Sequence, residues 1–126
     1  MSFTTGRHTM RTEHLDRFPE DWQPVAQVFS ALGDTTRQNI LLLFEPGEEL
    51  SIKTIASMFA LGRSTIVHHL SILEEAEILS VRRTGRQTLY SIRYDQMLGS
   101  LEKLRLYIEA DLNTLATDAN HKREIT

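Results

Sequence analysis

The stretch that decides the fold is "SIKTIASMFALGRSTIVHHLSIL", residues 51–73. Its first half follows a preferred N-cap, Ser51, and carries one apolar face at helical spacing: Ile52, Ile55, Ala56 and Phe59. After the four residues "ALGR", Ser64 opens a second helix with its own inner stripe: Ile66, Leu70 and Leu73. A short helix, a tight turn and a second helix predict a helix-turn-helix.

The residues that follow change from a helical to a strand-like pattern. "ILSVRR" (78–83) and "RQTLYSI" (86–92) are rich in β-forming residues and are joined through Thr84-Gly85, which predicts a hairpin. A hairpin placed directly after a helix-turn-helix is a wing, so this segment predicts a winged helix-turn-helix.

Further helices flank this unit on both sides. Upstream, Asp21 is the expected N-cap of a helix that tolerates Pro24 in its first turn and stops at Gly33, and Asp34 caps the next helix, which ends before Pro46. Downstream, residues 96–115 form a helix with one apolar face: Leu98, Leu101, Leu104, Ile108, Leu112 and Leu115. The expected fold class is mainly α with a β-hairpin wing.

The chain therefore divides into a flexible arm (1–13), a winged helix-turn-helix domain with flanking helices (14–116) and a flexible polar tail (117–126). A domain of this size buries only part of its surface, and an apolar helix face is relieved by a partner chain. We expect a homodimer formed through residues near 14–32 and 96–115. The face of the last helix, with Tyr107 beside it, is also a candidate pocket wall, although dimer packing is the simpler reading.

The composition limits the function classes. The 126 residues contain no cysteine, which excludes disulfides and thiolate metal sites. The longest apolar run is "ILLLF", residues 40–44, far too short to span a bilayer, and the N-terminus lacks the apolar region of a secretory signal. We expect a cytoplasmic protein with no membrane partner.

The second helix of the motif carries the polar residues expected of a helix that enters the major groove of DNA. Residues 62–93 hold five arginines and three glutamates, a local charge of +2 in a chain whose net charge is −3. The predicted partner is double-stranded operator DNA, and the predicted contacts are Arg63, Ser64, Thr65, Val67, His68, Ser71, Arg82, Arg83 and Arg86. A protein-docking module is the alternative, although Val67 is the single apolar anchor on this face.

The neighbouring His68 and His69 could suggest a metal or catalytic site. Adjacent helical residues point about 100° apart, so the two rings cannot easily converge on one ion. We expect His68 to face DNA and His69 to pack near the core. Ser64 and His68 have the spacing of a nucleophile and base, but no third member or oxyanion hole accompanies them, so no enzyme is predicted.

The remaining candidate metal ligands lie near the two termini: His8, His14, Asp118, His121 and Glu124. Zinc or nickel accepts such nitrogen and oxygen ligands, which makes a metal-responsive regulator the runner-up. Polar termini without a site are the simpler reading, and neither a metal nor another cofactor is predicted.

Two segments, "ALGDTTRQNILLLF" and "ELSIKTIASMFALGRSTIVHHLSILEEAEILSVRRTGRQTLYSI", carry the patterns L-G-D-x-T-R, S-T-x-x-H-H-L-x-x-L and G-R-x-x-x-Y in that order. Over residues 25–93 the chain resembles the ArsR family of dimeric bacterial winged-helix repressors. The resemblance implies a symmetric dimer and ligand-controlled binding to an operator. It also implies groove contacts from Arg63, Ser64, Thr65 and His68, and wing contacts from Arg83 and Arg86.

The chain departs from the metal-sensing members of that family. Many of them carry two cysteines at the start of the third helix, where this sequence has Ser51 and Lys53. Another subgroup places Asp and His ligands along the last helix, and this sequence has no histidine between Gln96 and Leu115. The effector is therefore left open.

Overall fold

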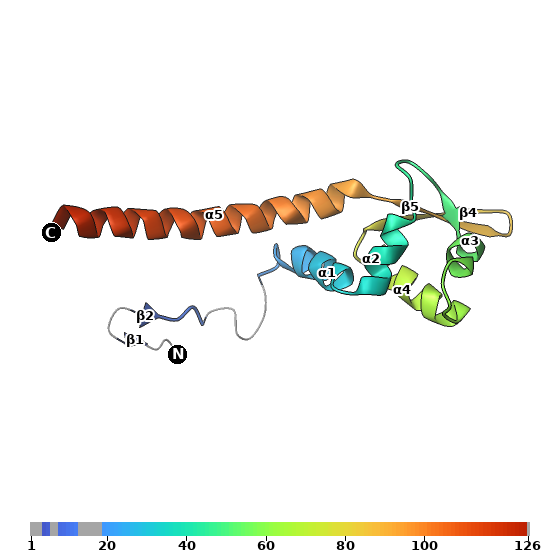
Figure 1. Ribbon diagram of the computed structural model, residues 1–126, viewed down its shortest axis with the longest axis horizontal. Coiled ribbons are helices and arrows are strands. Elements are labelled where there is room, and N and C mark those ends of the chain that lie inside the picture. The colour runs from blue at the N-terminus through green and yellow to red at the C-terminus, as the bar shows by residue number, and fades with distance from the viewer. Residues whose placement is uncertain (1–3, 6–7, 13–18, 126) are drawn as a thin grey trace.

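The computed structural model describes residues 4–5, 8–12 and 19–125 of the chain. Two short strands, β1 (Thr4–Thr5) and β2 (His8–Thr9), precede the main body. The main body follows in this order: α1 (Gln23–Leu32), α2 (Thr35–Leu42), β3 (Leu50–Ser51), α3 (Ile52–Ser57), α4 (Arg63–Glu75), β4 (Leu79–Thr84), β5 (Gln87–Ile92) and α5 (Tyr94–Ile125). The predicted fold class, mainly α with a β-hairpin wing, is confirmed (Figure 1).

The core lies where α1, α2, α3 and α4 meet the small sheet. The apolar stripes predicted from the sequence supply Ile55, Ile66, Leu70 and Leu73 to its centre. Ile40 and Ile78, which belong to neither stripe, are equally without solvent exposure. Tyr90 of β5 closes the cluster on the sheet side. Burial of these side chains on both helices of the motif fixes the angle at which α4 leaves the body.

Three of the predicted helix signals are confirmed. Gly33 is the C-cap of α1, the Asp34 carboxylate accepts a hydrogen bond from the Arg37 backbone N–H, and the Ser51 hydroxyl accepts one from Thr54. The predicted cap at Asp21 is wrong, because the N-cap of α1 is Trp22 and no side chain caps this end. If Asp21 were the N-cap, Pro24 would be the third helical residue. The backbone N–H of that residue normally donates to the cap side chain, and proline has no N–H to donate.

The sheet has three antiparallel strands in the order β3-β5-β4. The wing pairs Leu79 with Ile92 at its base and Thr84 with Gln87 at its tip, so its loop is Gly85-Arg86. Gly85 has φ 58°, as the first loop residue of a tight hairpin requires. The sequence did not predict β3, whose two residues are too few to give a strand period.

The last helix is longer than predicted. We expected it to end near Leu115 and a polar tail to follow from residue 117, but α5 continues to Ile125 and projects away from the body (Figure 1). No glycine or proline stops it after Leu115, and Thr114 and Thr117 donate hydrogen bonds to the carbonyls of Ala110 and Asn113. No helix of the described residues combines the length and the apolar character that crossing a bilayer requires.

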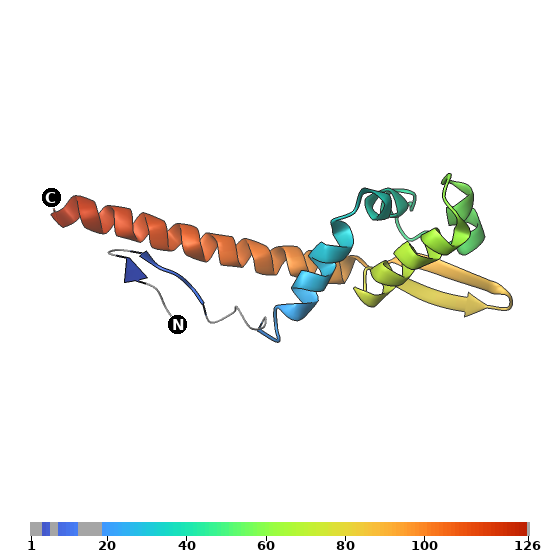
Figure 2. The ribbon, with the colours of Figure 1, turned by 90° about the horizontal axis from the view of Figure 1, so that it is seen from below.

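The described N-terminal residues run beside α5 in both ribbon views (Figures 1 and 2). The Arg11 guanidinium donates to the Tyr107 hydroxyl at 2.6 Å and to the Asp111 carboxylate at 3.0 Å. Within the segment expected to lack structure, Thr4 pairs with Thr9 across β1 and β2. The division into domains stays a prediction.

Candidate nucleic-acid interface

The two faces of α4 have opposite character. Its buried face is formed by Ile66, Leu70 and Leu73, none of which is accessible to solvent. Ser64, His68 and Ser71 follow one another at helical spacing on the opposite face, and all three are exposed. The helix begins at Arg63 after the N-cap Gly62, one residue earlier than predicted. The N-terminal turns of α4 therefore present polar side chains on a rigid support.

Every predicted contact residue is exposed. In both ribbon views the turn that starts α4 and the loop of the wing lie at the end of the molecule opposite the free end of α5 (Figures 1 and 2). The structure thus brings the predicted residues of α4 and of the wing to one end of the molecule, where they can meet the same ligand.

The two neighbouring histidines have different surroundings. His69 is half-buried, and its Nδ1 lies 3.2 Å from the Arg37 Nη1. Because a guanidinium can only donate, Nδ1 is the acceptor in this contact. His68 is exposed, and the two rings are 6.1 Å apart and tilted. His69 therefore holds the fold together, as expected, and His68 is available to a ligand.

The sequence did not assign a role to Arg37, which joins three helices. Besides His69 of α4, its guanidinium donates to the carbonyl of Ala31 at 2.6 Å and to that of Ser30 at 3.3 Å, both near the end of α1. The Ser30 carbonyl also accepts from the Gly33 backbone N–H, so Arg37 adds a second donor there and provides a donor for the Ala31 carbonyl. The L-G-D-x-T-R pattern is therefore a structural junction that sets α4 against α1 and α2.

The arginines of the wing lie on different faces of the sheet. Arg83 is on the face of Val81 and Tyr90, next to the helices, whereas Arg82 is on the opposite face. The Glu49 carboxylate accepts two hydrogen bonds from Arg82, at 2.8 and 2.9 Å. This pairing lowers the pKa of Glu49 and neutralises the charge of Arg82. The sequence placed Arg82 with the other wing arginines and missed Glu49.

The described arginines differ in whether their guanidinium groups have a hydrogen-bond or ion-pair partner within the protein. Arg63, Arg83 and Arg86 form no hydrogen bond or ion pair with the described residues. Elsewhere in that part of the chain, acidic partners hold Arg11, Arg82, Arg93 and Arg105, and backbone carbonyls hold Arg37. Among the described residues, the arginines without a partner are Arg63, which opens α4, and Arg83 and Arg86 of the wing.

Tyr90, the tyrosine of the G-R-x-x-x-Y pattern, belongs to the core. Burial raises its pKa, and the charge of Glu74 acts in the same direction, while the charge of Arg83 opposes them. The hydroxyl therefore stays protonated at neutral pH, and its ring supports the sheet that carries the basic loop.

The predicted terminal metal ligands are only partly described. Asp118 and His121 are exposed and lie on α5, and His14 falls outside the described residues. Within the described part of the chain, no three His, Cys, Asp or Glu side chains lie close enough together to hold a metal ion. The metal-responsive alternative stays untested.

An exposed polar helix after a tight turn, supported by a buried apolar face and followed by a basic hairpin, defines a winged helix-turn-helix DNA-binding domain. Residues 34–81 match the sequence profile of the family described as "Bacterial regulatory protein, arsR family". The chain is 34% identical over 88 residues to the transcriptional repressor SdpR of Bacillus subtilis, covering 70% of this chain and 97% of SdpR. The chain belongs to the arsR family and is a DNA-binding transcriptional regulator.

Other relatives agree with this assignment. A cadmium resistance transcriptional regulatory protein, a CadC homolog of Staphylococcus aureus, is 31% identical over 83 residues, which span 66% of this chain and 69% of the relative. An ArsR-like transcriptional regulator from Rhodococcus sp. RHA1 superposes with a TM-score of 0.67 at 25% identity, covering 78% of this chain and 92% of that one. The family consists of regulators, so the prediction that the chain is not an enzyme is confirmed.

The fold has a further solved counterpart. A homodimeric winged helix-turn-helix DNA-binding domain from Mycobacterium bovis superposes with a TM-score of 0.58 at 22% identity, covering 79% of this chain and 90% of that domain. At this identity the likeness concerns the fold, and it confirms the winged-helix architecture.

Proposed function

We propose that the chain acts as a homodimeric repressor that binds a near-palindromic operator and is released by an effector. Repression is supported by the relative SdpR, which is named a transcriptional repressor, and dimerisation by the homodimeric domain from Mycobacterium bovis. Large apolar side chains left exposed along α5, including Leu101, Ile108 and Leu112, supply a surface for the second copy. Acting on promoter DNA would place the protein in the cytoplasm.

The proposed contacts divide into base reading and backbone binding. Arg63 at the start of α4 pairs with guanine, Ser64 and Thr65 bind phosphate or a base edge, and Val67 contacts a thymine methyl group. His68 and Ser71 extend this face along the groove. Arg83 and Arg86 of the wing bind phosphate or reach the minor groove, and two recognition helices enter major grooves about 34 Å apart.

The observation that carries the proposal is the set of unpartnered arginines. A charged group without a protein partner is hydrated at no cost in the free state and can exchange its counterions for phosphate. Arg63 opens α4, Arg83 and Arg86 belong to the wing, and all three lack a hydrogen bond or ion pair with the described residues. Arg82 is also a predicted contact, but it must first leave Glu49.

Operator binding by fluorescence anisotropy tests the proposal. A promoter fragment from the protein's own locus is compared with a scrambled duplex across a salt series, with and without EDTA, zinc or nickel. We expect salt-dependent binding that prefers the promoter. Release on addition of metal would support the metal-responsive alternative, and equal binding to both duplexes would contradict sequence-specific regulation and favour a protein-docking module.

Substitutions separate the two kinds of contact. We expect Arg63→Ala to weaken promoter binding by about 1–3 kcal/mol and scrambled binding by less. Arg83→Ala and Arg86→Ala should weaken binding to the promoter and to the scrambled duplex alike. Each should also reduce the slope of log affinity against log salt concentration by about 1. Arg11→Ala removes the same charge beside α5 and is the matched control. Equal losses on both duplexes for Arg63→Ala would contradict its base-reading role.

A further inference from the structure

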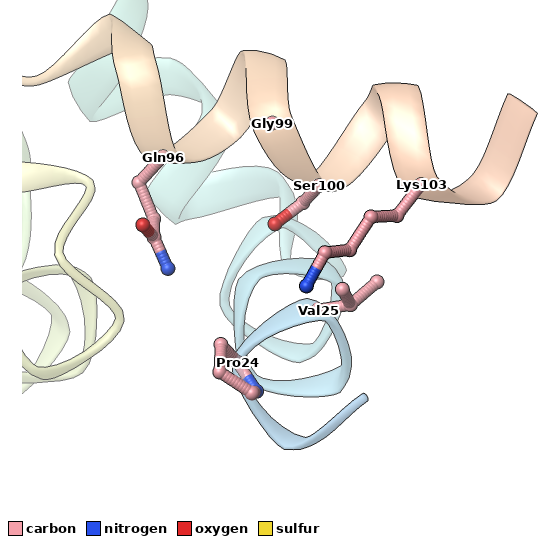
Figure 3. Close-up of a pocket in the computed structure, with 6 residues that line it drawn as sticks. All are labelled: Pro24, Val25, Gln96, Gly99, Ser100 and Lys103. Atoms are coloured by element: carbon pink, nitrogen blue, oxygen red, sulfur yellow. The ribbon is translucent and has the colours of Figure 1, made fainter. Parts of the chain in front are cut away.

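The contact between α1 and α5 contains a small cavity with polar walls. Its volume is about 120 Å³, and α1 contributes an apolar side, Pro24 and Val25. The wall contributed by α5 is formed by Gln96, Gly99, Ser100 and Lys103 (Figure 3). Its polar residues are spaced at i, i+4 and i+7, and they differ in burial: Ser100 is buried, Gln96 is partly buried and Lys103 is exposed.

Ser100 is the buried polar residue of this wall, but its hydroxyl is not sealed from solvent, because none of the fully enclosed side-chain polar atoms among the described residues lacks a hydrogen-bond partner. It is 4% exposed, and its hydroxyl has no hydrogen-bond partner among the described residues. Figure 3 shows the hydroxyl pointing from α5 toward α1, between the side chains of Gln96 and Lys103. Buried polar groups in proteins are nearly always hydrogen-bonded, to protein, water or a ligand. The cavity is the space from which such a partner can reach Ser100.

The charge at this cavity favours an anion. The Lys103 ammonium donates one hydrogen bond, to the Asp21 carbonyl at 3.2 Å, and forms no ion pair with the described residues. An ammonium group has three donors, so two stay available. Gln96 lies in the first turn of α5, where unpaired backbone N–H groups favour negative charge, and Asp95 of the same turn already supplies one carboxylate.

We propose that this cavity binds a small monocarboxylate and is the effector site. The carboxylate would accept hydrogen bonds from Lys103 and Ser100, and a short apolar tail would lie on Pro24 and Val25. The cavity has room for about four water molecules at roughly 30 Å³ each, which corresponds to a ligand of about five non-hydrogen atoms. The effector role rests on the proposed function, because α1 and α5 are the helices proposed to set the spacing of the two recognition helices.

Binding is tested on the full chain without DNA, by titrating sodium propionate into isotopically labelled protein at constant ionic strength. We expect saturable shifts of the backbone amides of Val25, Gly99 and Ser100. Propionamide, which has the same shape and no charge, should bind at least about tenfold more weakly because charge-assisted hydrogen bonds are lost. Equal, non-saturating shifts with both compounds would overturn the site and leave water as the partner of Ser100.

Variants test the named residues. Lys103→Met should weaken propionate binding by about tenfold, and Ser100→Ala by about fivefold, for the loss of one charged and one neutral hydrogen bond. Lys53→Met removes an exposed lysine on α3 and is the matched control. The spectrum of each variant shows whether it is folded. An unchanged affinity in folded Lys103→Met would overturn the assignment.

A second measurement separates this site from the proposed function. Promoter binding is followed by anisotropy with and without saturating propionate, using sodium chloride at equal ionic strength as the control. A lower promoter affinity in propionate supports the effector role, and an unchanged affinity overturns it. If propionate binds but no promoter does, the repressor function fails and the ligand site stands.

Discussion

The winged-helix region, residues 34–92, and the helix α5 differ in how much of their apolar side chains is exposed to solvent. Within the winged-helix region, Ile55, Leu70 and Ile78 have no solvent exposure at all. Along α5, Leu98 is 68% exposed and Leu115 is 66% exposed, although both lie on the apolar face that the sequence predicts. The first region completes a core within one chain, although Leu42 and Met58 lie exposed on its surface, and the second region has no such core.

This difference separates the roles of the two regions. A closed core holds α4 and the wing rigidly, so their polar residues keep one geometry relative to each other. An uncovered apolar helix of this length favours association with a second copy, which then fixes the distance between two recognition helices. The winged-helix region would determine which base sequence is recognised, and α5 would determine the distance between the two half-sites.

The largest expected effect is the loss of unfolding free energy when a side chain of the buried core is truncated. Leu70→Ala should lower the free energy of unfolding by about 2–5 kcal/mol, because Leu70 is fully buried and its removal leaves a cavity. Leu115→Ala removes the same atoms from an exposed site and should change the stability of the monomer by less than about 0.5 kcal/mol. Denaturation at low protein concentration measures both. Equal losses would contradict the comparison.

The second expected effect concerns association through α5. Ile108→Asp places a charge in the middle of the apolar face and should raise the dissociation constant of the dimer by at least about tenfold, or 1.4 kcal/mol. Sedimentation as a function of concentration measures this change. Asn113→Asp adds the same charge on the opposite side of α5 and is the control. A similar loss in both variants would show that charge, and not the predicted face, controls association.

The same difference explains what the sequence could predict. Asp34, Ser51 and the stripe of α4 act through neighbours a few residues away, so spacing alone predicts them. The Glu49–Arg82 pair and the contact between Arg37 and His69 join residues 33 and 32 positions apart in the chain, and no local pattern encodes them. The sequence predicts too early an end for α5, because the polar residues after Leu115 suggest fraying, but neither glycine nor proline follows to stop the helix.

A smaller effect is expected at the end of α4, where Glu77 has φ 60°. Its N–H donates to the Glu74 carbonyl, and the Ile78 N–H donates to the Leu73 carbonyl, both at 2.9 Å, which is a Schellman motif. Glycine is favoured in this left-handed position, so Glu77→Gly should stabilise the fold by about 0.5–1 kcal/mol. Glu75→Gly, inside the helix, should instead destabilise it by about 1 kcal/mol. Thermal unfolding measures both, and loss of stability in both would contradict the assigned strain.

The smallest expected effect concerns the ion pair in which Glu49 holds the Arg82 guanidinium within the winged-helix region. Glu49→Gln should release Arg82 and tighten binding to any duplex by about twofold to threefold at low salt, with a steeper salt slope if Arg82 then reaches phosphate. Glu102→Gln removes the same charge from a carboxylate paired with an arginine on α5. Anisotropy on promoter and scrambled DNA compares the two variants. Equal tightening would mean that net charge alone is responsible.

The pH dependence of the same pair gives an independent check on its presence in solution. Arg82 lowers the pKa of Glu49 in the folded state, so the pair contributes stability above the ordinary pKa of a glutamate, and this contribution is lost as the pH falls through the lowered value. Glu49→Gln should remove that part of the acid sensitivity. If the variant and the parent lose stability in parallel on acidification, Arg82 is not held by Glu49, and it belongs with the arginines that we propose to bind DNA without first leaving a partner.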